Sequence, residues 1–240
     1  MNTTRREVLA SFTLGGAAMA LPDSRSLFPQ GPAGAPKPGA HTIKPLPFDP
    51  GKLQGLSEKL VVSHHDNNYA GAVKNLNKVE GDLANVTKDT PSYLVAGLKE
   101  RELTFRNSAL LHEHYFGNLG GNGKLDGAIG AALAAAFGSS GRFEELFRAT
   151  AMSIAGGSGW VVLSHDLYRD ALVACWSSGH TVNHAGGNPL LVLDMFEHAF
   201  HIDYGAAAAK YVDAFFANIN GDEVNRRYEA SRKAAAAMRS

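Results

Sequence analysis

The chain has 240 residues with 23 Lys+Arg, 23 Asp+Glu, 10 His and 1 Cys, and 45% of its residues are hydrophobic. This length and apolar content fit one globular unit of ordinary size, or two small ones, and exclude wholesale disorder. A formal net charge of +0 argues against the broad cationic surface that binds nucleic acid or anionic membranes. Because Cys175 is the sole cysteine, an internal disulfide and a cysteine-based zinc cluster are excluded. The unusual feature of the composition is its number of histidines, 10 against a single cysteine.

Residues 1–20 have the composition of an export signal. Arg5 and Arg6 precede a weakly apolar run over residues 8–17, and small residues suited to cleavage follow at 18–20. The run is too short and too rich in glycine to span a bilayer, so no stable membrane span is expected. The Arg pair resembles a twin-arginine signal, whose pathway carries folded proteins, and an ordinary signal peptide is the alternative. We therefore expect an exported protein, in a bacterial periplasm or outside the cell.

The segment that follows the signal is rich in proline. Eight of the 10 prolines lie between Pro22 and Pro50. Proline cannot continue a helix and favours extended backbone, so residues 21–44 are predicted to form a Pro/Gly-rich linker.

Two long helical patterns follow the linker. From Leu53 to Leu83 apolar residues recur at steps of three or four, and Pro91 opens a second helix that reaches Asn118. The pair predicts an antiparallel helical hairpin domain over residues 45–121. The glycine cluster before Lys124 lacks the glycine and hydroxyl positions of a phosphate-binding loop and follows no strand, so it is interpreted as a helix stop.

The remaining residues, 122–240, mix helical patterns with short runs rich in Val and aromatic residues. Helices are predicted at 125–137, 142–154, 206–219 and 222–238, and strands at 160–163, 171–176 and 190–193. The predicted fold class is α+β, an N-terminal antiparallel helical hairpin domain plus a C-terminal α/β domain with a small three-stranded antiparallel sheet.

Asp194 and His198 form the most specific pattern in the chain. Asp194 ends a buried-looking strand, where an unpaired carboxylate carries a heavy desolvation penalty and needs a cationic partner. His198 follows four residues later, so in a helical turn both side chains point the same way and share one ion. The alternative is an Asp that caps a helix, with a histidine nearby by chance.

Two further histidines lie on apolar stripes of the predicted hairpin. His112 continues the spacing of Phe105 and Ala109, which turns it toward the core. His64 continues the stripe of its own helix, although periodicity does not exclude His65 beside it. A single core histidine is more often a hydrogen-bonded structural residue, but two on neighbouring helices, together with a buried Asp and His, favour a metal.

Such a site contains nitrogen and oxygen donors only. Three neutral imidazoles and one carboxylate give a ligand set of charge −1, which leaves room for solvent on the metal. Thiolates are absent, which disfavours soft metals and iron–sulfur clusters. Iron, manganese and zinc all fit on ligand type.

These residues resemble the iron/manganese superoxide dismutase family. The resemblance begins at Leu46-Pro47-Phe48-Asp49 and ends at Asp194 to His198 with Ala199 after it, so it covers essentially the whole chain beyond the signal. Between these segments it includes His64-His65, Asn75-Leu76-Asn77, His112, Phe116, Asn118-Leu119 and Gly157-Ser158-Gly159-Trp160. The last segment, D-x-[WF]-E-H-A, is the most specific signature of the family.

The resemblance implies a mononuclear redox metal. Its ligands would be His64, His112, Asp194 and His198, with a water or hydroxide as the fifth ligand. The metal would be one Fe or Mn ion per subunit, and the substrate superoxide, which is converted to oxygen and hydrogen peroxide. Val192 stands where iron-using relatives tend to be bulkier than manganese ones, which favours iron slightly.

The resemblance also assigns residues around the metal. Trp160 and Phe116 would wall the pocket, and Phe196 occupies a position usually held by Trp. Glu197 would hydrogen-bond the ligand His198 of a partner subunit, which implies a homodimer or homotetramer.

The substrate entrance departs from the family pattern. Asn68 and Ala72 stand where the family has an entrance His and Tyr, and Ala72 cannot supply a phenol. His201 stands where a Tyr partner of the entrance His is usual. Asn68 is therefore the candidate gateway residue, and proton delivery is expected to be slower or routed differently.

The hydrogen-bond partner of the metal-bound solvent also departs from the pattern. Ser108 stands at one customary glutamine position, and the loop before the last strand carries His180 and His184 instead. Some iron-type members have a histidine in this loop within a similar H-x-x-N-H stretch, which makes His180 the candidate solvent partner after a one-residue shift in the alignment. His41 and His165 are expected to be ordinary surface residues, and Cys175 to pack in the sheet.

Two other functions remain as alternatives. A metal-binding protein on this scaffold with weak or lost dismutase activity is suggested by Asn68 and Ala72. A zinc hydrolase would need a general base beside the metal, and Glu113, the one nearby candidate, follows His112 on the wrong helix face. Dismutation instead requires a metal that alternates between two oxidation states, which excludes zinc.

Overall fold

The computed structural model describes residues 39–239 of the 240-residue chain. The predicted export signal and most of the predicted linker lie outside the described residues. Among the described helices, none combines the length and the apolar character that crossing a membrane requires.

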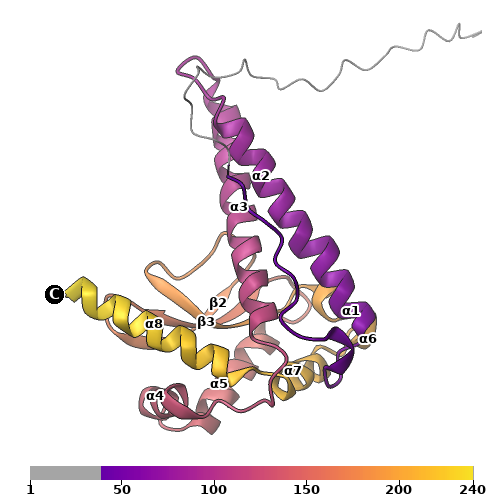
Figure 1. Ribbon diagram of the computed structural model, residues 1–240, viewed down its shortest axis with the longest axis vertical. Coiled ribbons are helices and arrows are strands. Elements are labelled where there is room, and N and C mark those ends of the chain that lie inside the picture. Colours follow the sequence, from indigo (N-terminus) through magenta and orange to yellow (C-terminus); the bar gives the residue numbers. More distant parts are fainter. Residues whose placement is uncertain (1–38, 240) are drawn as a thin grey trace, which may run out of the picture.

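A long helical hairpin dominates the N-terminal part. The chain passes through a 3₁₀ turn, Pro50–Lys52, and then α1, Glu58–Ser63, a π-helical segment, His64–Tyr69, and α2, Ala70–Leu83. It returns along α3, Ser92–Gly117. Figure 1 shows α2 and α3 running side by side, with their far end projecting beyond the rest of the molecule. The predicted hairpin of helices is confirmed.

The first helix begins later than the apolar spacing from Leu53 predicts. Gly55 has φ +72°, a left-handed backbone that breaks a helix. Ser57 then caps α1, because its side chain accepts a hydrogen bond from the backbone N–H of Leu60 at 3.1 Å. The same Ser57 hydroxyl donates to Asp203 at 2.6 Å, which ties the start of α1 to the C-terminal part.

The segment His64–Tyr69 is π-helical, where one uninterrupted α-helix was predicted. A π-helical segment widens the helix locally and rotates the side chains that precede it relative to those that follow. His64, His65 and Tyr69 are all buried in it, although they could not share one face of an α-helix. The predicted helix therefore exists, but it is interrupted at the candidate ligand.

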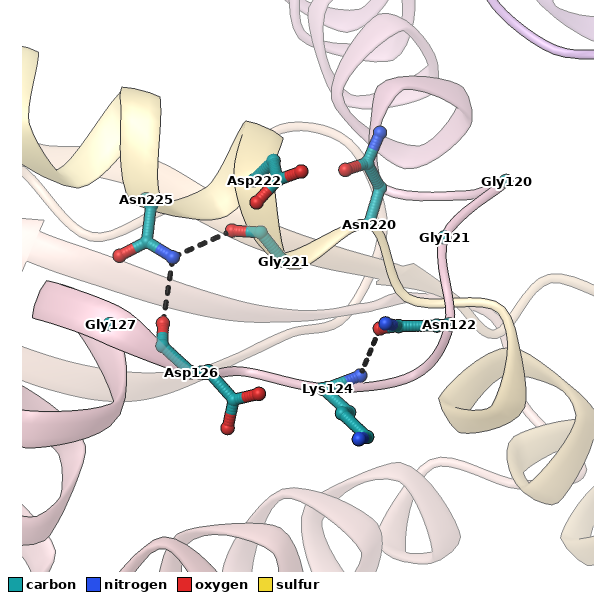
Figure 2. Close-up of a pocket in the computed structure, with 10 residues that line it drawn as sticks. All are labelled: Gly120, Gly121, Asn122, Lys124, Asp126, Gly127, Asn220, Gly221, Asp222 and Asn225. Atoms are coloured by element: carbon teal, nitrogen blue, oxygen red, sulfur yellow. Dashed lines mark hydrogen bonds between the residues drawn. The ribbon is translucent and has the colours of Figure 1, made fainter.

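The glycine cluster after α3 forms a turn. Gly120 has φ +86°, and a side chain on Gly121 would come within 2.2 Å of the Ile219 carbonyl oxygen. Figure 2 shows this turn facing the start of α8, Gly221–Arg239, around a solvent-open hollow of about 710 Å³ that also contains Lys124. No strand precedes the glycines in the described chain, and the interpretation as a helix stop holds.

The predicted three-stranded antiparallel sheet is confirmed. Its strands are β1, Trp160–Asp166, β2, Ala171–Ser177, and β3, Gly187–Asp194, in the order β2-β1-β3. Trp160 in the central strand pairs with Ser177 on one side and Asp194 on the other. This register places Asp194 next to Trp160 at one end of the sheet.

Helices cover both faces of the sheet. The further helices are α4, Gly127–Phe137, α5, Ser140–Ser153, α6, His201–Tyr204, and α7, Ala208–Ala217. Helix α3 packs on β3, α5 packs on β1 and β2, and α8 packs on β1 and β3. Every residue of β1 is buried, as expected for a central strand covered on both sides. The sheet is therefore a rigid base between the hairpin and the C-terminal helices.

One histidine was assigned wrongly from the sequence. β1 extends to Asp166, so His165 is a buried strand residue rather than a surface residue in a turn. His41 is exposed, as expected, and Cys175 lies half-buried on β2.

Candidate metal centre

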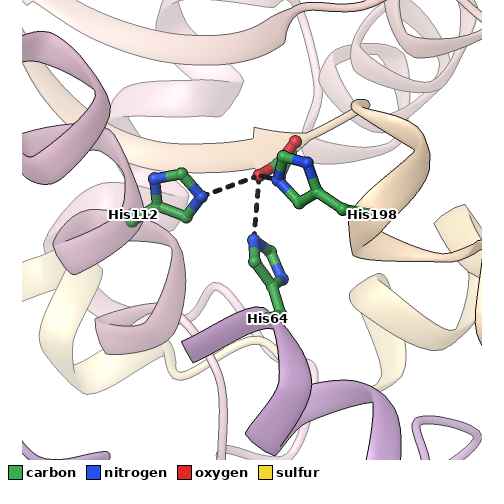
Figure 3. Close-up of side chains that lie close together, drawn as sticks. His64, His112 and His198 are labelled. Atoms are coloured by element: carbon green, nitrogen blue, oxygen red, sulfur yellow. Dashed lines mark hydrogen bonds and ion pairs between the residues drawn. The ribbon is translucent and has the colours of Figure 1, made fainter. Parts of the chain in front are cut away.

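Four side chains converge between the hairpin and the sheet. One ligand atom from each of His64, His112, Asp194 and His198 lies within 4.8 Å of the others. The Nε2 atoms of His64, His198 and His112 lie 3.1, 3.2 and 3.6 Å from Asp194 Oδ2. Figure 3 shows the three imidazole rings turned toward a common point. His65, which periodicity left as an alternative to His64, instead contacts the backbone oxygen of Lys44.

Each of these side chains comes from a different element. His64 begins the π-helical segment, His112 lies on α3, and Asp194 is the last residue of β3. His198 lies in a 3₁₀ turn, Glu197–Ala199, directly after the strand. Residues 130 apart in the sequence are thus brought into contact, since His64 hydrogen-bonds Asp194.

The carboxylate of Asp194 is held from several sides. Oδ1 accepts a hydrogen bond from the backbone N–H of Phe196 at 2.8 Å, and Oδ2 faces the histidines. The backbone oxygen of Asp194 accepts a hydrogen bond from the Tyr211 hydroxyl at 2.7 Å. The two interpretations of this residue, turn cap and ligand, are therefore compatible, because each uses a different carboxylate oxygen.

The hydrogen bonds of His112 indicate a cluster built to hold a cation. His112 Nδ1 donates to the backbone oxygen of Ser108 at 2.7 Å, so in the neutral ring Nε2 carries a lone pair. This Nε2 is buried without a hydrogen-bond partner in the described chain, and it faces the carboxylate of Asp194 at 3.6 Å. A lone pair opposite a carboxylate oxygen in a buried place is unfavourable unless a cation lies between them. The donor set fits a metal ion.

The protonation states also suit a metal site. Burial lowers the pKa of His112 to about 3 and the pKa of His64 in the same direction, so both rings are neutral near pH 7. Burial opposes ionisation of Asp194, but His198 and His64 hold the pKa of that carboxyl well below its usual range. The cluster therefore offers neutral imidazole nitrogens and one anionic oxygen without first releasing protons from these groups.

The amino-acid sequence of the chain is similar to those of known proteins. Residues 125–227 match the family model described as iron/manganese superoxide dismutases, C-terminal domain. The chain is 47% identical over 192 residues to the superoxide dismutase [Fe] of Cupriavidus metallidurans, which covers 80% of this chain and 98% of the relative. The chain belongs to the iron/manganese superoxide dismutases.

More distant relatives agree with this assignment. The superoxide dismutase [Fe] of Aquifex pyrophilus is 33% identical over 211 residues, covering 84% of this chain and 98% of the relative. The superoxide dismutase [Mn] 1 of Halobacterium salinarum is 30% identical over 194 residues, covering 79% and 95%. The function is conversion of superoxide to oxygen and hydrogen peroxide, with one Fe or Mn ion per subunit.

Aromatic side chains wall the dismutase site. Trp160 is fully buried, and its ring centroid lies 5.1 Å from that of His112. Phe116 lies 5.0 Å from His64 by the same measure. Phe196 stacks on His180 with ring centroids 4.7 Å apart and an interplanar angle of 8°. These rings pack against the imidazoles of His64, His112 and His180.

His180 lies beside the cluster. Its Nδ1 accepts a hydrogen bond from Trp160 Nε1 at 3.1 Å. Its ring centroid lies 6.4 Å from that of His112, and burial lowers its pKa. His180 therefore faces the site as a neutral side chain. His184, the second histidine of this loop, lies apart from the cluster and faces Asp166 across 3.6 Å.

A cavity of about 280 Å³ leads from solvent to the cluster. It reaches His112 and His198, and Asn68 lines it together with Ala72 and His180. The amide of Asn68 makes no side-chain hydrogen bond in the described structure. Asn68 and Ala72, the two positions predicted to form the entrance, therefore lie on the same cavity as the ligands His112 and His198.

Other predicted residues lie outside this cavity. Glu197 and His201 are exposed and line a separate hollow of about 290 Å³ with Phe200. Glu113 points away from the cluster, because its carboxylate pairs with Lys44 and accepts a hydrogen bond from the Tyr69 hydroxyl at 3.0 Å. Glu113 is therefore not a general base for a hydrolytic reaction at the metal.

Two supporting residues were not found from the sequence. Tyr211, on α7, holds the backbone of Asp194, and Asn107, on α3, holds the backbone of His180. Apolar periodicity places Tyr211 in the core but says nothing of its hydroxyl. Asn107 lies one residue from the buried face of α3, where no sequence signal separates it from an ordinary surface amide.

Proposed function

We propose that His64, His112, Asp194 and His198 hold an iron ion, and that this ion is the redox centre for superoxide dismutation. The observation that carries the proposal is the buried, unpartnered Nε2 of His112 opposite the Asp194 carboxylate. Iron rather than manganese is favoured by Val192, which is buried two residues before Asp194, and by the 47% identical relative named as an iron enzyme.

A redox metal held there would take up an electron from one superoxide and pass it to the next. The protein determines how readily the metal changes its oxidation state. Asp194 contributes the single negative charge, which favours the more oxidised ion, and Tyr211 and Phe196 fix its position through hydrogen bonds. Ser108 fixes the tautomer of His112 and so directs its Nε2 into the site.

The proton required by each half-reaction needs a donor beside the metal. His180 is the proposed partner of the solvent there, because its ring lines the cavity next to His112 and His198. Asn68 is the proposed gateway residue, since its unpaired amide lies on the path from solvent. Trp160 forms the wall and supports His180.

Oligomerisation is proposed from the exposed residues beside the ligand His198. Glu197 follows Phe196 on the surface, and its proposed role is to bridge to His198 of a partner subunit in a homodimer or homotetramer. Size-exclusion chromatography with light scattering tests this, and a monomer with full activity would contradict it.

Export by a twin-arginine-type signal is proposed for residues 1–20, with the periplasm or the exterior as the destination. Arg5 and Arg6 before the apolar run support it. A reporter fused after residue 30 should lose export when both arginines are changed to lysine. Unchanged export would contradict the route.

The metal and the activity are tested together. The purified protein should contain about one redox metal per chain by elemental analysis and should remove superoxide in a standard assay. Stoichiometric zinc, or iron or manganese without superoxide removal, would contradict the proposal. His180→Ala should keep the metal and change the potential and the rate, and unchanged values would contradict the role of His180.

A further inference from the structure

The backbone of His180 is held by two side-chain amides. Asn107 Nδ2 donates to the backbone oxygen of His180 at 2.7 Å, and Asn183 Nδ2 donates to the same oxygen at 3.0 Å. Asn107 lies on α3, whereas Asn183 belongs to the loop between β2 and β3 that carries His180. The loop is therefore tied to the ligand-bearing helix at the residue whose ring lines the cavity.

The ring of His180 is held independently of its backbone. The indole N–H of Trp160 can only donate a hydrogen bond, so Nδ1 of His180, 3.1 Å away, must be the acceptor. A neutral imidazole with an acceptor at Nδ1 carries its proton on Nε2. Phe196, stacked at 4.7 Å, limits rotation of the ring. His180 Nε2 has no hydrogen-bond partner within the described residues, so its N–H is free to donate a hydrogen bond to a molecule in the cavity.

We propose that Asn107 is a positioning residue that fixes His180 in the tautomer with its proton on Nε2, by holding the backbone of His180 within reach of the Trp160 indole. The inference rests on the proposed role of His180 as the partner of the solvent beside the metal. Ser108, the next residue of α3, cannot take this part, because its hydroxyl lies 3.3 Å from His112 Nδ1. Without the Asn107 amide, the backbone oxygen of His180 keeps only the bond from Asn183 within the loop and loses its hydrogen bond to α3.

The tautomer is measured on the metal-free protein by the ¹⁵N shifts of the His180 ring, assigned with His180→Gln. The wild-type protein should show a protonated Nε2 and an unprotonated Nδ1. Asn107→Asp keeps the shape of the side chain but lacks the N–H donor, so it should give a mixture of tautomers, as should Asn107→Ala. Asn122→Ala, in the hollow of Figure 2, is the control and should leave the ring unchanged.

The metal-loaded variants give a second measurement. Asn107→Asp should keep its metal but lose about tenfold in kcat, with a shifted pH profile, as is typical when an outer partner of a metal site is removed. If an Asn107 variant fails to fold, Asn183→Ala tests the same carbonyl and should move the tautomer in the same direction. A wild-type ring protonated on Nδ1, or an Asn107→Asp protein with wild-type tautomer and rate, overturns the proposal. An unchanged rate in His180→Ala would instead contradict the role of His180, which the tautomer measurement does not depend on.

Discussion

Two buried clusters of histidine and aspartate lie on opposite faces of the same sheet. The first joins His64, His112 and His198 to Asp194 on the α3 side. The second centres on His165 of β1, on the α8 side, where Nδ1 meets Ser231 Oγ at 2.7 Å and Nε2 meets Asp170 Oδ1 at 2.9 Å. Both contain at least one buried imidazole and a carboxylate, so residue types alone do not separate them.

The clusters differ in whether their hydrogen bonds are complete. Both ring nitrogens of His165 have protein partners, so nothing further is required there. His112 leaves one buried nitrogen without a partner, directed at an anion. A buried polar atom without a partner costs free energy, and proteins retain such an atom where a ligand completes it. This unsatisfied nitrogen, rather than the number of histidines, separates the first cluster from the second. His184 Nδ1, the other buried ring nitrogen without a partner in the described chain, belongs to neither cluster.

The second cluster fastens the C-terminal helix to the sheet. Asp170 lies in the turn between β1 and β2 with φ +52°, a left-handed conformation that few side chains adopt. Besides His165, its carboxylate pairs with Arg239 of α8 at 3.0 Å. Ser231, His165 and Asp170 have the residue types of a hydrolytic triad, but Ser231 is only 2% exposed and has no access to a substrate.

The largest effect is predicted for an Asp→Asn substitution, which can be made in each of the two clusters and compared. Asp194→Asn removes the only negative charge of the metal site, so metal retention and superoxide removal should fall by more than about a hundredfold, beyond the loss typical of outer partners. Asp170→Asn makes the same change at the second cluster and should leave the metal content unchanged. Elemental analysis and a superoxide assay check both. Retention of metal by Asp194→Asn would show that the clusters do not differ as proposed.

A second prediction concerns stability. His165→Leu removes the shared partner of Ser231 and Asp170, and buried polar groups left without a partner destabilise the fold, here by about 2 kcal/mol. Urea unfolding of the metal-loaded protein measures this change. The metal content should stay as in the wild type, because the substitution lies on the other face of the sheet. Loss of metal with unchanged stability would reverse the assignment of the two clusters.

A third prediction concerns pH in the metal-free protein. Burial lowers the pKa of His112 from 6.5 to about 3, so between these values the unfolded chain binds a proton that the folded chain does not. The free energy of unfolding should therefore decrease as the pH falls below about 6.5, by about 1.4 kcal/mol per pH unit for each such histidine. Urea titrations at several pH values check this. His112→Gln should show a smaller slope, and an equal slope would contradict the attribution.

The sequence predicts the fold class because the long helices and the short strands carry different apolar periods. It does not predict the π-helical segment, because Leu53, Leu56 and Leu60 fit a continuous helix and only tertiary contacts place His64, His65 and Tyr69 in the core together. The sequence also predicts a strand that ends too early, because β1 continues through the polar residues His165 and Asp166. Their hydrogen-bond partners within the fold make these two residues compatible with a central strand.

The candidate site was predictable where one local pattern carries the signal. Asp194 and His198 are four residues apart, and their proximity follows from the turn between them. His180 was named only through the family resemblance, and Asn107 was not named at all. Its hydrogen bond spans 73 residues of sequence, and the spacing of residues along one helix contains no information about such a contact.

The smallest effect is predicted for Arg239→Ala, a substitution that tests how firmly the second cluster holds α8. Arg239 pairs with Asp170 near the end of the helix, but its side chain is 44% exposed, and an exposed ion pair contributes little because water and salt screen it. Arg239→Ala should therefore destabilise the protein by less than about 1 kcal/mol, and the effect should shrink further at high salt. Urea unfolding at low and high salt measures both. An effect as large as that of His165→Leu would mean that the exposed ion pair, rather than the buried hydrogen bonds of His165, fastens the helix to the sheet.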